Sequence, residues 1–87
     1  MTLEAVGTLL HVGREYLLDT GRVKFWNPTE GWGVITPDDG SEEVFIHRRD
    51  IGFKDKKGKK NLQQGQKLKY DTVRTANGLM AINVRNG

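Results

Sequence analysis

The sequence predicts an all-β domain, in the form of a small barrel or sandwich, from two observations. From about residue 20 onward, turn-forming residues divide the chain into short segments. Each segment has the length of a strand and is rich in β-branched or aromatic residues, and none has the pattern of a helix. Five such strands are typical of small barrels and sandwiches, and 87 residues suit a single domain.

The strands are delimited by four predicted turns. Residues 27–31 (Asn-Pro-Thr-Glu-Gly), 37–40 (Pro-Asp-Asp-Gly) and 63–65 (Gln-Gln-Gly) favour turns or tolerate positive φ. Asn77-Gly78 lies between two apolar-rich segments and is the strongest hairpin signal. We therefore expect strands at residues 21–27, 31–36, 43–47, 66–75 and 79–85.

Alternation with a period of two assigns the faces of these strands. The shared core is expected to contain Val23, Ile35, Val44, Ile46, Leu68, Tyr70, Ile82 and Val84. The opposite face then presents three rings to solvent, those of Trp32, Phe45 and His47. In the first strand, alternation groups Phe25 with Val23 and Trp26 with Lys24, so it does not decide which ring points outward.

Aromatic rings that are left in water need an explanation. Burying a large apolar side chain contributes roughly 1.5–3 kcal/mol, so a small domain that exposes several rings forgoes stability. The reverse assignment, with the rings in the core, would expose Val23, Ile35, Val44 and Ile46 and bury polar residues. The exposed rings therefore indicate a binding surface.

Charge is unevenly distributed along the chain, whose formal net charge is +3. Residues 1–43 hold 3 basic and 8 acidic side chains, whereas residues 44–87 hold 11 basic and 3 acidic ones. A basic half suits a surface that faces a polyanion, although a solubilising surface would have the same composition. Residues 54–60 (Lys-Asp-Lys-Lys-Gly-Lys-Lys) lack apolar side chains, so we expect a solvated, mobile loop that attracts phosphates.

Other classes of function are disfavoured. The chain has no cysteine, which excludes disulfides, thiolate zinc sites and a cysteine nucleophile. It has neither an apolar run of the roughly 20 residues that span a bilayer nor a secretory pattern, so we expect a cytoplasmic protein with no membrane partner. His47 lacks a partner for general-base or metal chemistry, and the acidic residues within 38–43 belong to a tight turn. We expect no catalytic residue, no cofactor and no metal site.

Residues 1–19 form an extension before the first predicted strand. They are too apolar for a disordered tail, although Gly7 and Gly13 weaken a helix. The pattern is compatible with two strands, at residues 8–12 and 14–18, hinged at Gly13. It is also compatible with an amphipathic helix. Either would bury its apolar side against the barrel or against a second copy of the chain, so a homodimer through this extension is one expectation.

Three segments carry a further pattern. They read Gly-Arg-Val-Lys-Phe-Trp-Asn at 21–27, Gly-Trp-Gly-Val-Ile-Thr-Pro-Asp-Asp-Gly at 31–40 and Val-Phe-Ile-His at 44–47. Together they resemble bacterial cold-shock proteins and the related Y-box domains, and the last two correspond to the ribonucleoprotein motifs of that family. The resemblance implies a five-stranded antiparallel OB-fold barrel over residues 20–87. It also implies binding of single-stranded RNA or DNA by stacking of bases, and a role as a nucleic-acid chaperone that regulates transcription or translation.

The resemblance also implies a binding site. Carried over by position, the contact residues are Lys24, Phe25, Trp26, Trp32, Phe45, His47 and Phe53. Nearby basic residues are expected to neutralise phosphates, namely Arg48, Arg49, Lys54, Lys56, Lys57, Lys59 and Lys60.

The chain departs from the family pattern at several positions. The family usually has Trp-Phe at 25–26, Phe at both Val34 and Arg48, and Lys at Glu30. With fewer rings, we expect binding that is more electrostatic and more sensitive to salt than is typical. The alternative hypothesis is a protein-interaction module that uses the OB surface and residues 1–19.

Overall fold

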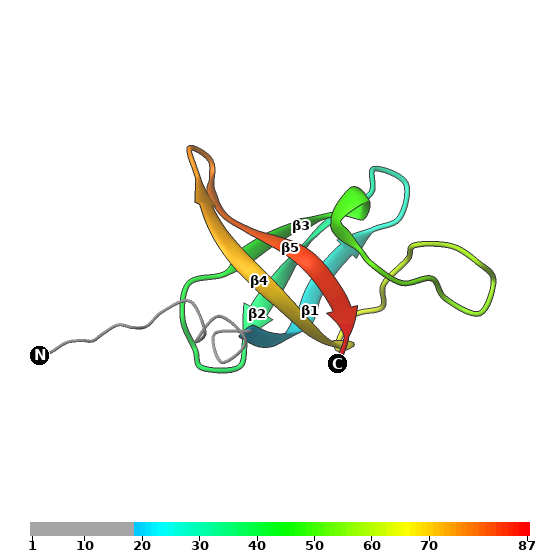
Figure 1. Ribbon diagram of the computed structural model, residues 1–87, viewed down its shortest axis with the longest axis horizontal. Helices are drawn as coiled ribbons and strands as arrows, with labels where there is room; N and C mark the ends of the chain where they lie inside the picture. Colours follow the sequence, from blue (N-terminus) through cyan, green and yellow to red (C-terminus); the bar gives the residue numbers. More distant parts are fainter. Residues whose placement is uncertain (1–18) are drawn as a thin grey trace, which may run out of the picture.

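The computed structural model describes residues 19–87, which form five strands closed into one barrel (Figure 1). The strands are β1 (Asp19–Asn27), β2 (Trp32–Pro37), β3 (Val44–His47), β4 (Lys67–Thr75) and β5 (Gly78–Asn86). A single turn of 3-10 helix, Arg48–Asp50, follows β3. The predicted all-β fold is confirmed, and each predicted strand end lies within two residues of the observed one.

The strand order around the barrel is β1-β2-β3-β5-β4, with β4 pairing back to β1. Four of the five ladders are antiparallel, as predicted, whereas β3 and β5 pair in parallel, with Phe45 opposite Met80. A long segment, residues 48–66, connects β3 to β4 and contributes Ile51 and Leu62 to the interior. Its middle part projects from the barrel (Figure 1). These connections give the OB-type barrel that the family resemblance implied.

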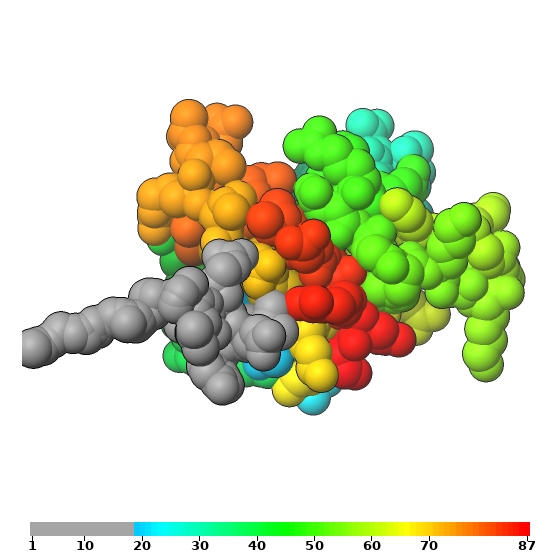
Figure 2. All heavy atoms as spheres, viewed as in Figure 1, coloured from blue at the N-terminus to red at the C-terminus, as the bar shows by residue number. Residues whose placement is uncertain are grey.

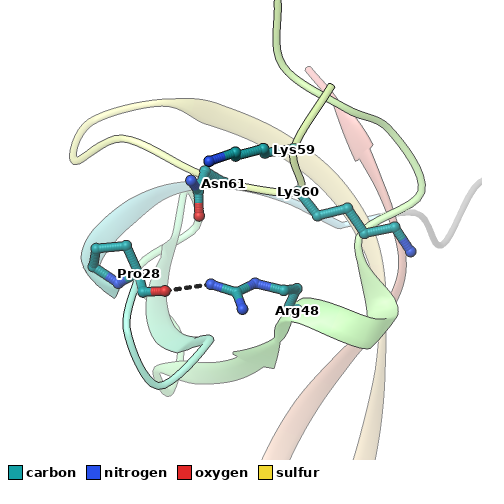
Figure 3. A pocket seen from close by; sticks show the side chains of 5 residues that line it. All are labelled: Pro28, Arg48, Lys59, Lys60 and Asn61. Carbon is teal, nitrogen blue, oxygen red and sulfur yellow. Dashed lines mark hydrogen bonds between the residues drawn. The ribbon is translucent and has the colours of Figure 1, made fainter. Parts of the chain in front are cut away.

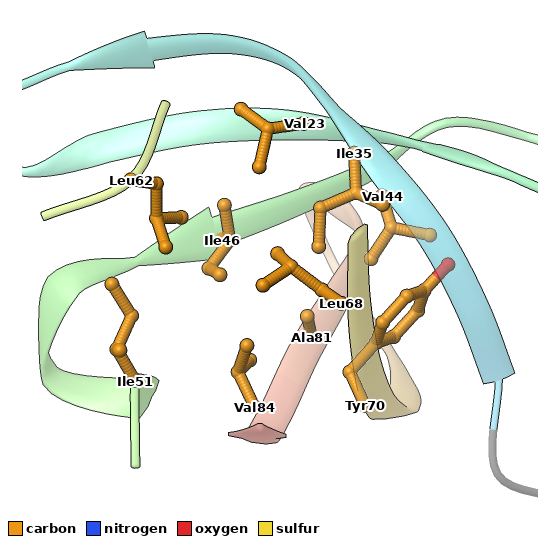
Figure 4. Packing of buried hydrophobic residues seen from close by; sticks show 10 residues of the cluster. All are labelled: Val23, Ile35, Val44, Ile46, Ile51, Leu62, Leu68, Tyr70, Ala81 and Val84. Atoms are coloured by element: carbon orange, nitrogen blue, oxygen red, sulfur yellow. The ribbon is translucent and has the colours of Figure 1, made fainter. Parts of the chain in front are cut away.

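The interior is a single apolar cluster (Figure 4). Seven of the eight predicted core residues are buried, and Ile82 is the exception. The hydrophobic cluster also contains three residues that alternation did not assign to the core, namely Ile51, Leu62 and Ala81. Tyr70 is fully buried, and its hydroxyl has no hydrogen-bond partner within residues 19–87.

A bulge in β5 explains why the prediction for Ile82 was wrong. Lys69 pairs with Arg85, but Asp71 pairs with Ile82, so two residues of β5 oppose one of β4. Within this bulge Asn83 has a φ of 51°, a left-handed conformation that asparagine tolerates better than most residues. The extra residue reverses the alternation, so Ala81 and Val84 both face inward and Ile82 is only half-buried.

A second bulge, in β1, decides between Phe25 and Trp26. Val23 pairs with Ile35, but Phe25 pairs with Val34, so Lys24 is the extra residue. Val23 therefore faces the core, while Phe25 lies on the outer face with 45% of its surface exposed. Simple alternation had grouped these two side chains on one face.

The expectations for residues 1–18 lie outside the described part of the chain. These expectations were a pair of strands or an amphipathic helix, and a homodimer interface formed by this extension. Among residues 19–87, no helix has the length and apolar character needed to cross a membrane.

Candidate nucleic-acid interface

Strand pairing gathers four predicted contact residues on one outer face of β1, β2 and β3. We call Phe25, Trp32, Phe45 and His47 the aromatic platform. In the register, Phe25 pairs with Val34 and Val34 with Phe45, and Trp32 pairs with His47. Because directly opposite residues share a face, these side chains form two adjacent rows. Trp32 and Phe45 are 40% and 41% exposed, values close to that of Phe25.

The rings of the platform are held by local contacts. The centroids of Phe25 and Trp32 are 5.3 Å apart, and the ring planes are tilted by 57°. Nδ1 of His47 accepts a hydrogen bond of 3.2 Å from the backbone N–H of Arg49, which caps the 3-10 turn and fixes the imidazole. Val34 lies between Phe25 and Phe45, where it supplies apolar surface but no ring. The platform is therefore an apolar, ring-bearing surface that is already formed in the free protein.

Trp26 does not belong to this platform. Its indole packs partly against the core, and its Nε1–H donates a 3.3 Å hydrogen bond to Oδ1 of Asn61. The absence of a side chain at Gly33 leaves room for the Trp26 ring. A Cβ at residue 33 would lie 2.8 Å from Cε3 of Trp26 and would also clash with the carbonyl oxygen of Phe25. Phe53 is half-buried and also packs against the core. The structure thus separates these two predicted contact residues from the platform.

The guanidinium of Arg48 is held beneath the first turn. It donates a hydrogen bond to the carbonyl oxygen of Pro28 (Figure 3). It also lies 6.0 Å from the centre of the Trp26 ring, at the limit for a cation–π contact. Together with Lys59, Lys60 and Asn61, Arg48 and Pro28 line a small cleft. Arg48 is therefore anchored to the first turn and shares a cleft with two lysines of the basic loop.

The basic loop, residues 54–60, is exposed except at Lys60, as predicted for a solvated segment. It stands out from the body of the protein as a yellow-green projection (Figure 2). Hydrogen bonds within the loop form an internal turn. Oδ1 of Asp55 accepts the backbone N–H groups of Lys57 and Lys59, each at 2.9 Å, and the Asp55 N–H donates to the Lys59 carbonyl. The turn keeps the predicted lysines together on one projection.

An open groove runs between this loop and the barrel. Phe25, Trp26, Phe53 and Leu62 contribute its apolar lining, and lysines of the basic loop lie along it. Five amide side chains complete the lining, those of Asn61, Gln63, Gln64, Gln66 and Asn86. Sequence reasoning missed these amides, because residues 63–65 have the composition of an ordinary turn and no periodic pattern marks their neighbours.

The remaining predicted cations are partly committed to acidic neighbours. Nζ of Lys24 lies 2.6 Å from Oε2 of Glu43, and both side chains are about half exposed. Arg49 is largely exposed and lies 3.7 Å from the carboxylate of Asp50. A single-stranded phosphate backbone would compete with these carboxylates for the two cations.

The acidic residues within 38–43 do not converge on one point. Asp38 is paired with Lys67 at 2.8 Å, and the hydrogen bond to this ammonium group is the main reason that the pKa of Asp38 lies below its ordinary value. Asp39 accepts from Ser41, and Glu42 lies 3.5 Å from Arg74. In the described part of the chain, no group of three or more histidine, cysteine or acidic side chains is placed to hold a metal ion.

Comparison with known proteins agrees with this geometry. A family model described as the 'Cold-shock' DNA-binding domain matches residues 19–86. The Cold shock-like protein CspA of Stigmatella aurantiaca is 43% identical over 67 residues, which are 77% of this chain and 94% of that protein. Cold shock-like protein CspE of Escherichia coli K12 is 41% identical over 64 residues, covering 74% and 88% of the two chains.

A solved structure described as Drosophila Unr CSD456 has the same fold, with a TM-score of 0.64 and 13% identity. The match covers 80% of this chain but only 26% of that one. The sequence relatives and the family model together carry the assignment, and the barrel agrees with it. The chain belongs to the cold-shock DNA-binding domain family, whose members bind nucleic acids and are not enzymes.

Proposed function

We propose that this protein binds single-stranded RNA or DNA by stacking bases on the aromatic platform and acts as a nucleic-acid chaperone. The observation that supports the proposal most strongly is the exposure of Phe25, Trp32 and Phe45 on one face, each by 40% or more. Each stacked base contributes roughly 1–3 kcal/mol, as judged by alanine substitution. Because every base has a planar face, such stacking tolerates many sequences.

The positive charge beside the platform supports a polyanionic ligand. Lys24, Arg49 and the basic loop up to Lys59 are exposed to solvent, and the loop projects beside the groove that Phe25 also lines. Each neutralised phosphate releases condensed counterions, so this part of the binding weakens as salt rises. A duplex covers the faces of its bases and presents only its phosphates to the site, so it binds less tightly.

Preference for single strands is sufficient for chaperone activity. A protein that binds the unpaired state but not the paired state shifts the equilibrium of a weak hairpin by mass action, without ATP. Through such opening the protein would regulate transcription or translation. The cytoplasmic location expected from the sequence remains part of this proposal.

Tryptophan fluorescence tests the proposal. The chain has two tryptophans, and the Trp26→Phe variant keeps Trp32 as the only reporter on the platform. We expect short single strands to quench Trp32 strongly, duplex of the same sequence to quench it much less, and added salt to weaken both. Absence of quenching at low salt would refute stacking on the platform.

Residues 1–19 add a separate proposal, a homodimer built through the extension. Sedimentation of the full-length chain and of residues 20–87 measures its contribution. A dimer that is lost on truncation would support the interface, and a monomer in both chains would remove it.

A further inference from the structure

The groove beside the basic loop differs in chemistry from the aromatic platform. The platform offers mainly aromatic rings, whereas the groove combines an apolar lining with amide side chains. Its apolar part consists of Trp26, Phe53 and Leu62, all of which pack in or against the core. Phe25 lines the groove and also belongs to the platform, so the two surfaces are continuous.

The amide side chains of the groove differ in whether they form hydrogen bonds to other protein groups. Oε1 of Gln66 accepts the backbone N–H of Gln63, and its Nε2 lies 3.5 Å from Oδ1 of Asn86. Asn61 accepts the indole N–H of Trp26. By contrast, the exposed side chains of Gln63 and Gln64 have no hydrogen-bond partner within residues 19–87. Their donors and acceptors are free to meet a ligand.

Two positional features favour a nucleic acid as the occupant of this groove. Lys54, Lys56, Lys57 and Lys59 lie along it, and among the described residues that line it Asp55 is the only acidic one. That carboxylate is engaged in the loop's own backbone turn. A nucleic-acid strand bound on the platform would therefore pass from Phe25 into a groove whose positive charge is complementary to its phosphates.

Glutamine side chains recognise bases through paired hydrogen bonds to the base edge. We infer that the groove is a second base-binding site, in which Gln63 and Gln64 read the hydrogen-bonding edges of bases that leave the platform. This inference rests on the proposed binding of single strands. It adds a source of sequence preference that stacking alone lacks, because stacking uses the base face and leaves the edge unread.

A chemical change to the base edge tests the inference. The probes are oligomers of about eight nucleotides, within the roughly 4–16 that an OB fold covers, made of uridine or of N3-methyluridine. The methyl group blocks the Watson–Crick edge and leaves the ring face. Their affinities are compared for the unaltered protein, the Gln63→Ala/Gln64→Ala variant and Asn77→Ala, a control amide in the β4–β5 turn that does not line the groove.

We expect the unaltered protein and Asn77→Ala to bind the uridine oligomer at least about fivefold more tightly than the methylated one. The double-glutamine variant should lose most of this ratio while keeping the affinity for the methylated oligomer. Both glutamine side chains are exposed, so thermal melting should be unchanged, which excludes misfolding as the cause. The same ratio in all three proteins would overturn the inference and leave the proposed function standing. No binding of either oligomer would instead refute the proposed function.

Discussion

The rings of Phe25 and Trp32 lie 5.3 Å apart between centroids, with a tilt of 57° between their planes. They come from neighbouring strands, and the bulge at Lys24 brings Phe25 onto the outer face. Tilted aromatic pairs at this spacing attract one another and restrict each other's motion. A base that stacks here therefore meets rings that are already positioned, which reduces the entropy lost on binding.

Removing a ring from the platform should weaken binding without unfolding the barrel. We expect Trp32→Ala and Phe45→Ala each to raise the Kd for a short single strand by about 5- to 100-fold, as expected for one lost stacking contact. The control is Val73→Ala, which removes an apolar side chain of β4 that is 38% exposed and lies off the platform. Fluorescence anisotropy of a labelled oligonucleotide measures the three values. An equal loss in the Val73 variant would contradict a localised platform.

Adding a ring to the platform should have the opposite effect. Val34 lies between Phe25 and Phe45 in the strand register and is only partly buried, so a larger side chain can extend over the surface. We expect Val34→Phe to lower the Kd for single strands about fivefold or more, since it supplies another stacking surface. Val34→Leu is the matched control, because it adds apolar bulk without a ring. Equal effects of phenylalanine and leucine would mean that apolar area, and not stacking, governs affinity.

Release of Lys24 from its carboxylate should strengthen binding. In Glu43→Gln the ammonium group, 2.6 Å from Oε2 in the unaltered protein, becomes free to contact a phosphate. We expect affinity at low salt to rise roughly two- to fivefold and the salt slope to steepen by about 0.7, the value for one further contact on a single strand. Folding stability should change by less than about 1 kcal/mol, since the pair is exposed. Glu42→Gln, which frees Arg74 instead, is the control, and an unchanged slope in Glu43→Gln would refute a role for Lys24.

Tyr70 gives a prediction for stability that is independent of binding. Its fully buried hydroxyl has no hydrogen-bond partner among the described residues. A buried polar group without a partner costs about 1–3 kcal/mol, so Tyr70→Phe should raise the free energy of unfolding by about 1 kcal/mol at neutral pH. Urea denaturation measures the change. Destabilisation of similar size would show that the hydroxyl is satisfied after all.

The same residue predicts how stability depends on alkaline pH. Burial, with a smaller contribution from the nearby carboxylate of Asp19, raises the pKa of Tyr70 from 10.0 to about 12. The unfolded chain therefore releases this proton first, and ionisation favours unfolding. The free energy of unfolding therefore does not change with the ionisation of this group below about pH 10, and it falls as the pH rises toward 12. Urea titrations across this range should show a steeper loss in the unaltered protein than in Tyr70→Phe, and parallel curves would contradict the assignment.

The sequence predicted the strands and most of the core because turn residues and alternation are local signals. It failed where one extra residue changes the phase of a strand. The bulge at Asn83 moved Ile82 out of the core and Ala81 into it, and the bulge at Lys24 left the choice between Phe25 and Trp26 open. Bulges depend on the pairing of both strands, so one strand's pattern does not reveal them.

Like the fold, the candidate site could be predicted from the sequence only in part. The platform follows from strand parity and motif resemblance, whereas the groove arises from side chains that are distant in the sequence. Trp26 meets Asn61 across 35 positions, and Arg48 reaches Pro28 across 20. Neither contact has a sequence pattern, because both depend on how the segment between β3 and β4 folds back on the barrel.

The most direct test of single-strand binding on the aromatic platform is a residue-by-residue map of where an oligonucleotide binds. Backbone amide NMR spectra of the 15N-labelled protein, recorded during titration with an oligonucleotide of about eight nucleotides, provide this map. Base stacking on the platform predicts the largest shift changes at Phe25, Trp32, Phe45 and His47, with further changes along residues 54–66. Changes confined to the β4–β5 hairpin, or absent from the platform at saturation, would contradict it.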